Sequence, residues 1–232
     1  MDNDYTAAPP ADQPARYGRK TAQAVETIRQ MIMDGELVPG EHLRQDDLAI
    51  RLGISRVPVR EALKMITSEG ILEHKPNVGH YVMERSSGDL RQITWLRNNC
   101  ELQLAEAITW PDQTHLDSMA ALNRKMLGRK FTAVDDCKPV VKVDTHFHQQ
   151  LWILSRDRIF AREVDKMWGM LVPYRSMMEY SPDVVQRMHD EHVAILAALA
   201  SRDSDQLISA LKMHQSHNQS YILGLVPSCL GT

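Results

Sequence analysis

Asp47-Leu-Ala-Ile-Arg-Leu-Gly-Ile-Ser-Arg-Val-Pro-Val-Arg-Glu-Ala-Leu63 is the stretch that decides the fold of the first part of the chain. Its apolar spacing predicts a short helix over residues 46–52 and another from Ser55 to about residue 69. Ser55 is a favourable N-cap, and Pro58 falls in the first turn, where its missing N–H does no harm. Two short helices joined by a tight turn containing Gly53 are typical of a helix-turn-helix.

The flanking sequence extends this motif on both sides. Val25, Ile28 and Ile32 recur at helical spacing and predict a preceding helix. After the motif, residues 71–74 and 80–83 have the pattern of two short strands around the turn 76–79. The sequence therefore predicts a winged helix-turn-helix whose wing is a small β-hairpin.

A stripe of cations lies along the second helix of the motif. Arg56, Arg60 and Lys64 are spaced i, i+4, i+8, so they share one face opposite buried apolar residues. Three charges at this spacing are usually just a solvated face. Placed between a helix-turn-helix turn and a wing, they instead predict contacts with phosphates and guanine edges in the major groove of DNA.

The remainder of the sequence has helical periodicity throughout. Helices are expected at 89–108, 112–128, 139–155, 158–179, 183–201 and 204–223, which favours an all-α bundle. The predicted fold is thus mainly α, a winged helix-turn-helix followed by a helical bundle. We expect a flexible tail at 1–18, a DNA-binding domain at 19–85, a helical effector and metal-binding domain at 86–225, and a C-terminal tail at 226–232.

Composition excludes several classes of protein. The 232 residues are 43% hydrophobic and 25% charged, with no apolar run long enough for a membrane span. Three separated cysteines, Cys100, Cys137 and Cys229, predict neither a disulfide framework nor a thiolate zinc site. The acidic start of the chain lacks the pattern of a secretory signal, so a cytoplasmic protein is expected. The net charge of −3 means that DNA contacts must come from locally placed cations.

Histidine and aspartate side chains in the second half suggest a metal site. Asp144 and His148 are four residues apart and share one helix face, which is by itself a weak signal. In the last helical hairpin, His192 and His214 lie at equal distances from a turn near residue 203. Imidazoles with one carboxylate suit a divalent Zn, Ni, Co, Mn or Fe ion.

Hairpin geometry does not choose a single histidine pair. His189 and His217 are also equidistant from the same turn, so they satisfy the test as well as His192 and His214 do. Both pairs remain open from the residues alone.

The first part of the chain resembles the GntR family of bacterial regulators. The resemblance rests on the run Ser-Arg-x-Pro-Val-Arg-Glu-Ala-Leu, together with Glu69-Gly-Ile-Leu72 and Pro76-Asn-Val-Gly79. It implies a DNA-contacting surface that comprises Ser55, Arg56, Val57, Pro58 and Arg60, with Gly79 and His80 at the wing tip. Val78 stands where the family usually has a basic residue, which puts wing contacts with phosphate in doubt.

Residues 89–223 resemble the FCD effector domain of the FadR branch of that family. The motifs Asp144-Thr-His-Phe-His148, Glu191-His-Val-Ala-Ile-Leu-Ala-Ala198 and Leu211-Lys-Met-His214 carry the likeness. The resemblance selects as metal ligands Asp144, His148, His192 and His214. It also implies an effector contact at Arg97 and Glu101, whose alternative role is an ordinary i, i+4 ion pair. Tyr174 and Arg175 are pocket-lining candidates.

These features together predict a regulator, and not an enzyme. We expect a homodimer that binds operator DNA and responds to a small carboxylate at the metal site. Two alternatives stay open: a metal-dependent hydrolase, or a regulator whose metal is purely structural.

Overall fold

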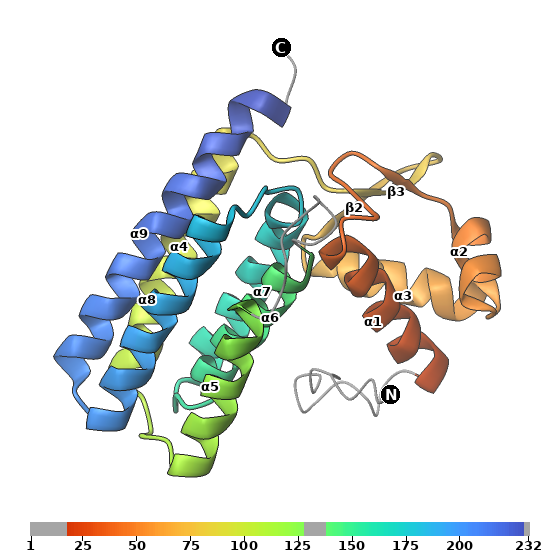
Figure 1. Cartoon of the computed structure of the whole chain (residues 1–232). Coiled ribbons are helices and arrows are strands. Elements are labelled where there is room, and N and C mark those ends of the chain that lie inside the picture. Colours follow the sequence, from red (N-terminus) through yellow and green to blue (C-terminus); the bar gives the residue numbers. More distant parts are fainter. Residues whose placement is uncertain (1–17, 128–137, 230–232) are drawn as a thin grey trace.

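The structure is a computed structural model that describes residues 18–127 and 138–229 (Figure 1). The predicted tail at 1–18 and Cys137 therefore lie outside the described residues, apart from Gly18. The first region contains α1 (Arg19–Met33), β1 (His42–Leu43), α2 (Gln45–Leu52), α3 (Arg56–Ser68), β2 (Leu72–Lys75) and β3 (Gly79–Val82).

The helix-turn-helix forms as its apolar pattern predicts. Gly53 ends α2 in the left-handed conformation at φ 63°, which a glycine adopts without strain. Val59, Leu63 and Ile66 are fully buried on the inner face of α3, where they pack with residues of α1 such as Ile28. Burial of these side chains fixes the outward face of α3.

The wing is part of a three-stranded antiparallel sheet with strand order β1-β3-β2. Sequence periodicity predicted β2 and β3 but missed β1, because two residues are too few to show alternation. In β1, His42 pairs with Tyr81 and Leu43 pairs with His80. Gly79 has φ 135°, a conformation that favours glycine, and a Cβ there would also lie 2.5 Å from the His42 imidazole of β1.

The second region is the predicted helical bundle (Figure 1). Its helices are α4 (Ser87–Glu106), α5 (Gln113–Leu127), α6 (Lys138–Trp152), α7 (Arg158–Arg175), α8 (Pro182–Ser201) and α9 (Ser204–Cys229). Ser86 caps α4, with its hydroxyl accepting from the Asp89 N–H while the Asp89 carboxylate accepts from the Ser86 N–H.

Three helix ends differ from the sequence prediction by three residues or more. Helix α6 ends at Trp152, three residues before the predicted end at 155. Helix α7 ends at Arg175, four residues early, because the Met177 N–H turns back to the Tyr174 carbonyl. Helix α9 continues to Cys229, so it occupies residues 226–229, where a tail was predicted.

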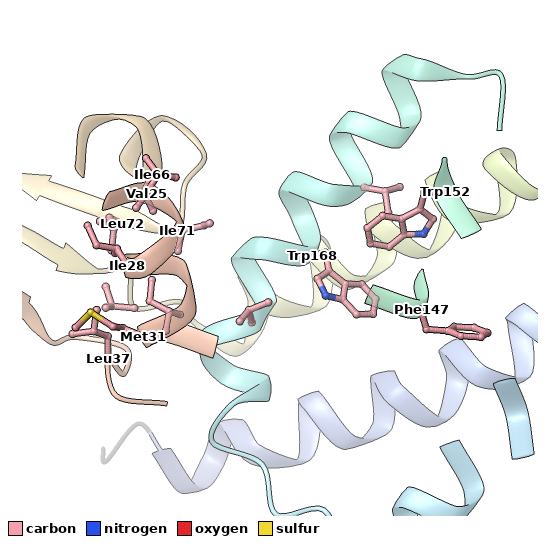
Figure 2. Close-up of a cluster of buried hydrophobic side chains, with 14 of the residues drawn as sticks. Val25, Ile28, Met31, Leu37, Ile66, Ile71, Leu72, Phe147, Trp152 and Trp168 are labelled. Carbon is pink, nitrogen blue, oxygen red and sulfur yellow. The ribbon is translucent and has the colours of Figure 1, made fainter. Parts of the chain in front are cut away.

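One hydrophobic core joins the two regions. It runs from Val25 and Ile28 in the winged helix through Ile71 to Trp168 and Phe147 in the bundle (Figure 2). Helices α6 and α7 are the bundle elements that contact α1. The orientation of the DNA-binding region is therefore linked by packing to α7.

Candidate metal centre and nucleic-acid interface

Three helices bring four potential metal ligands together. Asp144 and His148 lie on α6, His192 on α8 and His214 on α9, and all four side chains are fully buried. One ligand atom from each residue lies within 4.8 Å of all the others. Ligands bound at about 2.0–2.2 Å from one ion are separated by at most about 4.4 Å, so the spread is close to that of a coordination shell.

The outer nitrogen of each imidazole is held by a hydrogen bond. Nδ1 of His148 lies 2.8 Å from Oε1 of Glu101, and Nδ1 of His214 lies 2.8 Å from Oε2 of Glu191. Nδ1 of His192 lies 3.1 Å from Oδ1 of Asn123. Because these oxygens only accept, each Nδ1 carries the proton, and each neutral ring directs the lone pair of Nε2 into the cluster.

The four potential ligand atoms that face into the cluster do not satisfy one another's hydrogen-bonding capacity. Nε2 of His148 lies 2.9 Å from Nε2 of His214, and two lone pairs at this distance cannot hydrogen-bond. Asp144 Oδ1 and His192 Nε2 are 3.2 Å apart, yet both are buried without a hydrogen-bond partner. Nε2 of His214 also accepts from Nδ2 of Asn218 at 2.8 Å. A divalent cation would satisfy the other three inward atoms and would take the place of Asn218 at His214, so the residues present fit a metal.

The charge states of the four side chains favour the binding of a cation. Burial lowers the pKa of all three imidazoles, that of His192 to about 4, so they are neutral at pH 7. Burial alone would raise the pKa of Asp144, but attraction to Arg175, together with His192 and His148, holds it well below its usual value. The set therefore presents three neutral nitrogens and one carboxylate, which suits several transition metals.

Arg175 is the group that holds the free end of Asp144. Its Nη2 donates to Oδ2 of Asp144, and both residues are buried. Its guanidinium also lies 4.4 Å from the ring centroid of Trp168, in a cation–π contact. The sequence suggested Arg175 only as pocket lining, because nothing in its spacing connects it with Asp144.

Arg97 and Glu101 form the buried ion pair that was the alternative to an effector contact. Nη2 of Arg97 donates to Oε2 of Glu101 at 2.9 Å. Glu101 also accepts from Trp152 at 2.8 Å and from Gln215 at 2.9 Å. Glu101 thus orients His148 through a fully engaged carboxylate. Burial alone would raise the pKa of Glu101, but Arg97, His148 and Gln215 together hold it well below the usual range.

The rival histidine pair lies outside the cluster. His189 bonds to Asp190 at 3.1 Å, and His217, whose side chain is 44% exposed, bonds to Glu191 at 2.5 Å. Sequence reasoning missed Asn123 and Glu191 as the partners of His192 and His214. Glu191 precedes His192 within the quoted motif, whereas Asn123 gave no signal.

The exposed face of α3 presents the predicted cations. The side chains of Arg56, Arg60 and Lys64 are 72%, 53% and 59% exposed. Val57 and Ser55 are exposed beside them, and Pro58 is half-buried. Ser55 is the N-cap of α3, as predicted, although its hydroxyl makes no capping hydrogen bond.

The wing departs from the prediction at one residue. His80 is only 4% exposed and its ring lies 4.6 Å from that of His74 in a tilted arrangement, so the expectation that it contacts DNA at the wing tip is wrong. Alternation along β3 points its side chain inward, while half-buried Gly79 stays beside the turn. Exposed Lys75 at the end of β2 supplies a cation near Val78 that sequence reasoning overlooked.

A winged helix-turn-helix with an exposed basic helix, joined to a helical bundle that buries four potential metal ligands, is the arrangement of a DNA-binding regulator. The sequence matches the family "Bacterial regulatory proteins, gntR family" over residues 20–82 and the "FCD domain" over residues 92–217. The chain belongs to the GntR family of transcriptional regulators and carries an FCD effector domain.

Relatives are regulators of the same kind. The transcriptional repressor RspR of Escherichia coli K12 is 26% identical over 83% of this chain and 84% of its own length. The Nta operon transcriptional regulator of Aminobacter aminovorans is 25% identical over 81% of this chain and 87% of its own.

Solved structures share the fold. Escherichia coli McbR/YncC has a TM-score of 0.79 at 23% identity, covering 89% of this chain and 98% of its own. A GntR regulator from Rhodococcus sp. RHA1 has a TM-score of 0.74 at 22% identity, and the match covers 89% of this chain and 99% of the other. None of the described helices combines the length and apolar character that a membrane span needs.

Proposed function

We propose that this regulator binds operator DNA as a homodimer in the cytoplasm, under the control of a small carboxylate bound at a metal in its FCD domain. Its FCD domain supports placing it in the FadR subfamily, to which that domain was assigned by resemblance. The facing Nε2 atoms of His148 and His214, 2.9 Å apart and buried, carry the metal part of the proposal. A cation bound between two such lone pairs would satisfy both of them.

The proposed ligands are Asp144, His148, His192 and His214. When bound, the ion supplies Lewis acidity and open coordination positions for an anionic effector. Arg97 contributes a positive charge, and its Nε is buried without a hydrogen-bond partner in the described part of the chain. We propose that Arg97 attracts the effector carboxylate while Glu101 holds Arg97 in place.

The DNA-contacting surface that we propose comprises Ser55, Arg56, Val57, Pro58, Arg60, Lys64 and Gly79. Its support is the exposure of the α3 cations. His80 is left out because it is buried. A homodimer would place two α3 helices in successive turns of the major groove of a pseudo-palindromic operator.

Charge reversal tests the DNA surface directly. In the double variant Arg56→Glu/Arg60→Glu, two cations become anions facing phosphate, so operator affinity should fall at least about 100-fold. Fluorescence anisotropy with DNA from the region upstream of the chain's own gene, at fixed salt, measures this. Arg162→Glu is the control, because Arg162 is 70% exposed on α7, within the bundle. Equal operator binding by the two variants would refute the surface.

Chelation distinguishes the roles of the metal. If the ion takes part in effector control, then removing it with EDTA should abolish the effect of organic acids on operator binding. A purely structural metal predicts a loss of thermal stability with an unchanged effector response. Hydrolysis of ester or amide substrates that depends on added metal would instead favour the enzyme alternative.

A further inference from the structure

The last two residues of α7, Tyr174 and Arg175, make hydrogen bonds to two different parts of the molecule. Arg175 donates to the metal-ligand candidate Asp144. The neighbouring Tyr174 hydroxyl accepts the Arg85 backbone N–H at 2.5 Å and donates to the Met83 carbonyl at 3.4 Å. Residues 83–86 connect β3 to α4 and so join the DNA-binding region to the bundle. One helical turn therefore touches both the candidate site and the connection.

The same helix also contacts the chain directly after the DNA-reading helix. A Cβ on Gly70 would lie 2.7 Å from Cε of Met170, and a Cβ on Gly169 would lie 3.0 Å from Cδ1 of Ile71. The Arg85 side chain donates to the Gly70 carbonyl. The end of α3, the connection and α7 thus form one packed junction, which Figure 2 shows around Ile71.

Pro173 lies in α7 between the turn that carries Tyr174 and Arg175 and the part of the helix that packs on Ile71 and Gly70. Proline has no N–H, so the Gly169 carbonyl lacks its ordinary i+4 partner within the helix. The turn that carries Tyr174 and Arg175 is therefore less firmly bound to the part of α7 that packs on Ile71. A weakened last turn can move while the rest of the helix stays packed.

Asp144 is the group shared between the cluster and this turn. Its Oδ2 accepts from Arg175, while its Oδ1 lies among the imidazoles. A cation bound by Asp144 would compete with Arg175 for the same negative charge. Binding at the cluster therefore changes the force that holds Arg175, and with it the adjacent Tyr174.

We infer that Tyr174 is a positioning residue that couples the state of the metal centre to the segment 83–86 and, through it, to the DNA-binding region. This inference rests on the proposed function, because it requires a metal at Asp144. Coupling of this kind needs a physical element that both sites contact, and the Tyr174–Arg175 turn is such an element.

Hydrogen exchange of the full-length chain tests the inference without an operator or an effector. Zn²⁺ affinity is first measured by calorimetry, and exchange of the amides in residues 83–86 is then compared with and without Zn²⁺. Because Zn²⁺ weakens the hold of Asp144 on Arg175, the Arg85 amide should exchange at least about threefold faster in the Zn²⁺ form.

The variant Tyr174→Phe removes only the hydroxyl. It should abolish the Zn²⁺-dependent difference at 83–86 while its Zn²⁺ affinity stays within about threefold of the wild type. Tyr221→Phe is the matched control, because it deletes the same group from a half-buried tyrosine that stacks on Tyr180. This control should keep the difference.

The outcomes separate the inference from the function on which it rests. Tight Zn²⁺ binding with identical exchange of 83–86 in both forms overturns the coupling and leaves the metal site standing. A Zn²⁺-dependent difference in amide exchange at 83–86 that persists in Tyr174→Phe overturns the role of Tyr174. Absence of Zn²⁺ binding overturns both proposals. If Tyr174→Phe fails to fold, the wild-type comparison still decides the coupling.

Discussion

Two carboxylates outside the cluster, Glu101 and Glu191, fix the ring orientations of His148 and His214. Glu191 accepts from Nδ1 of His214 at 2.8 Å and from Nδ1 of His217 at 2.5 Å, so it holds one ligand ring in a fixed orientation. Its neighbour Asp190 has a side chain that is 63% exposed and pairs with His189, away from the cluster. Adjacent acidic residues thus serve different roles according to the helix face that they occupy.

This contrast gives a prediction for metal affinity. Glu191→Gln keeps the shape but weakens the acceptor that fixes the His214 tautomer, so Zn²⁺ affinity should fall about 10- to 100-fold. Asp190→Asn should leave it unchanged. Competition with a fluorescent zinc chelator measures both variants. Similar affinities for the two variants would show that Glu191 does not orient the ligand.

At the scale of elements, two helix ends show how backbone conformation selects residue type. Helix α2 ends at Gly53 and α8 ends at Arg202, both in the left-handed region at φ 63° and 56°. No atom lies within 4 Å of a Cβ placed on Gly53, so a substitution there meets backbone strain alone. Arg202 already carries that strain, because a side chain disfavours this conformation.

Substitutions at Gly53 and Arg202 should change the free energy of unfolding in opposite directions. Gly53→Ala should destabilise the chain by about 1 kcal/mol, since left-handed strain exceeds the entropy lost from the unfolded state. Arg202→Gly should stabilise it by about 0.5 kcal/mol for the reverse reason. Urea denaturation followed by circular dichroism measures both, and a destabilising Arg202→Gly would contradict this account.

At the scale of the whole molecule, a bound cation would hold three helices of the bundle together. The ligands lie on α6, α8 and α9, and the shared core continues from the bundle into the winged helix. An ion that binds only the folded chain stabilises it by mass action, by about 4 kcal/mol at a thousandfold excess over Kd.

Metal removal should therefore lower the melting temperature of the whole chain. For a protein of this size, about 4 kcal/mol corresponds to roughly 10 °C, measured by thermal denaturation with and without EDTA. His192→Ala should lack the EDTA-dependent shift, whereas His189→Ala should retain it, because His189 lies outside the cluster. A full shift in His192→Ala would place the stabilising ion elsewhere.

The sequence alone determined the helix-turn-helix, the helical bundle and the exposed cations of α3. These features depend on local periodicity and on residues such as Gly53 and Val59, whose effect is felt within a few positions. Resemblance was needed to choose His192 and His214 over His189 and His217, because both pairs have the same spacing about the hairpin turn.

Tertiary structure alone decided which side chains meet across helices. Arg175 lies 31 residues from Asp144, Asn123 lies 69 residues from His192, and Tyr174 lies 89 residues from Arg85, so no local pattern connects them. The burial of His80 depends likewise on the strands on both sides of β3, because His80 pairs with His74 of β2 and with Leu43 of β1. Contacts of this kind are set by the packing of whole elements, and periodicity carries information only about the face that one element presents.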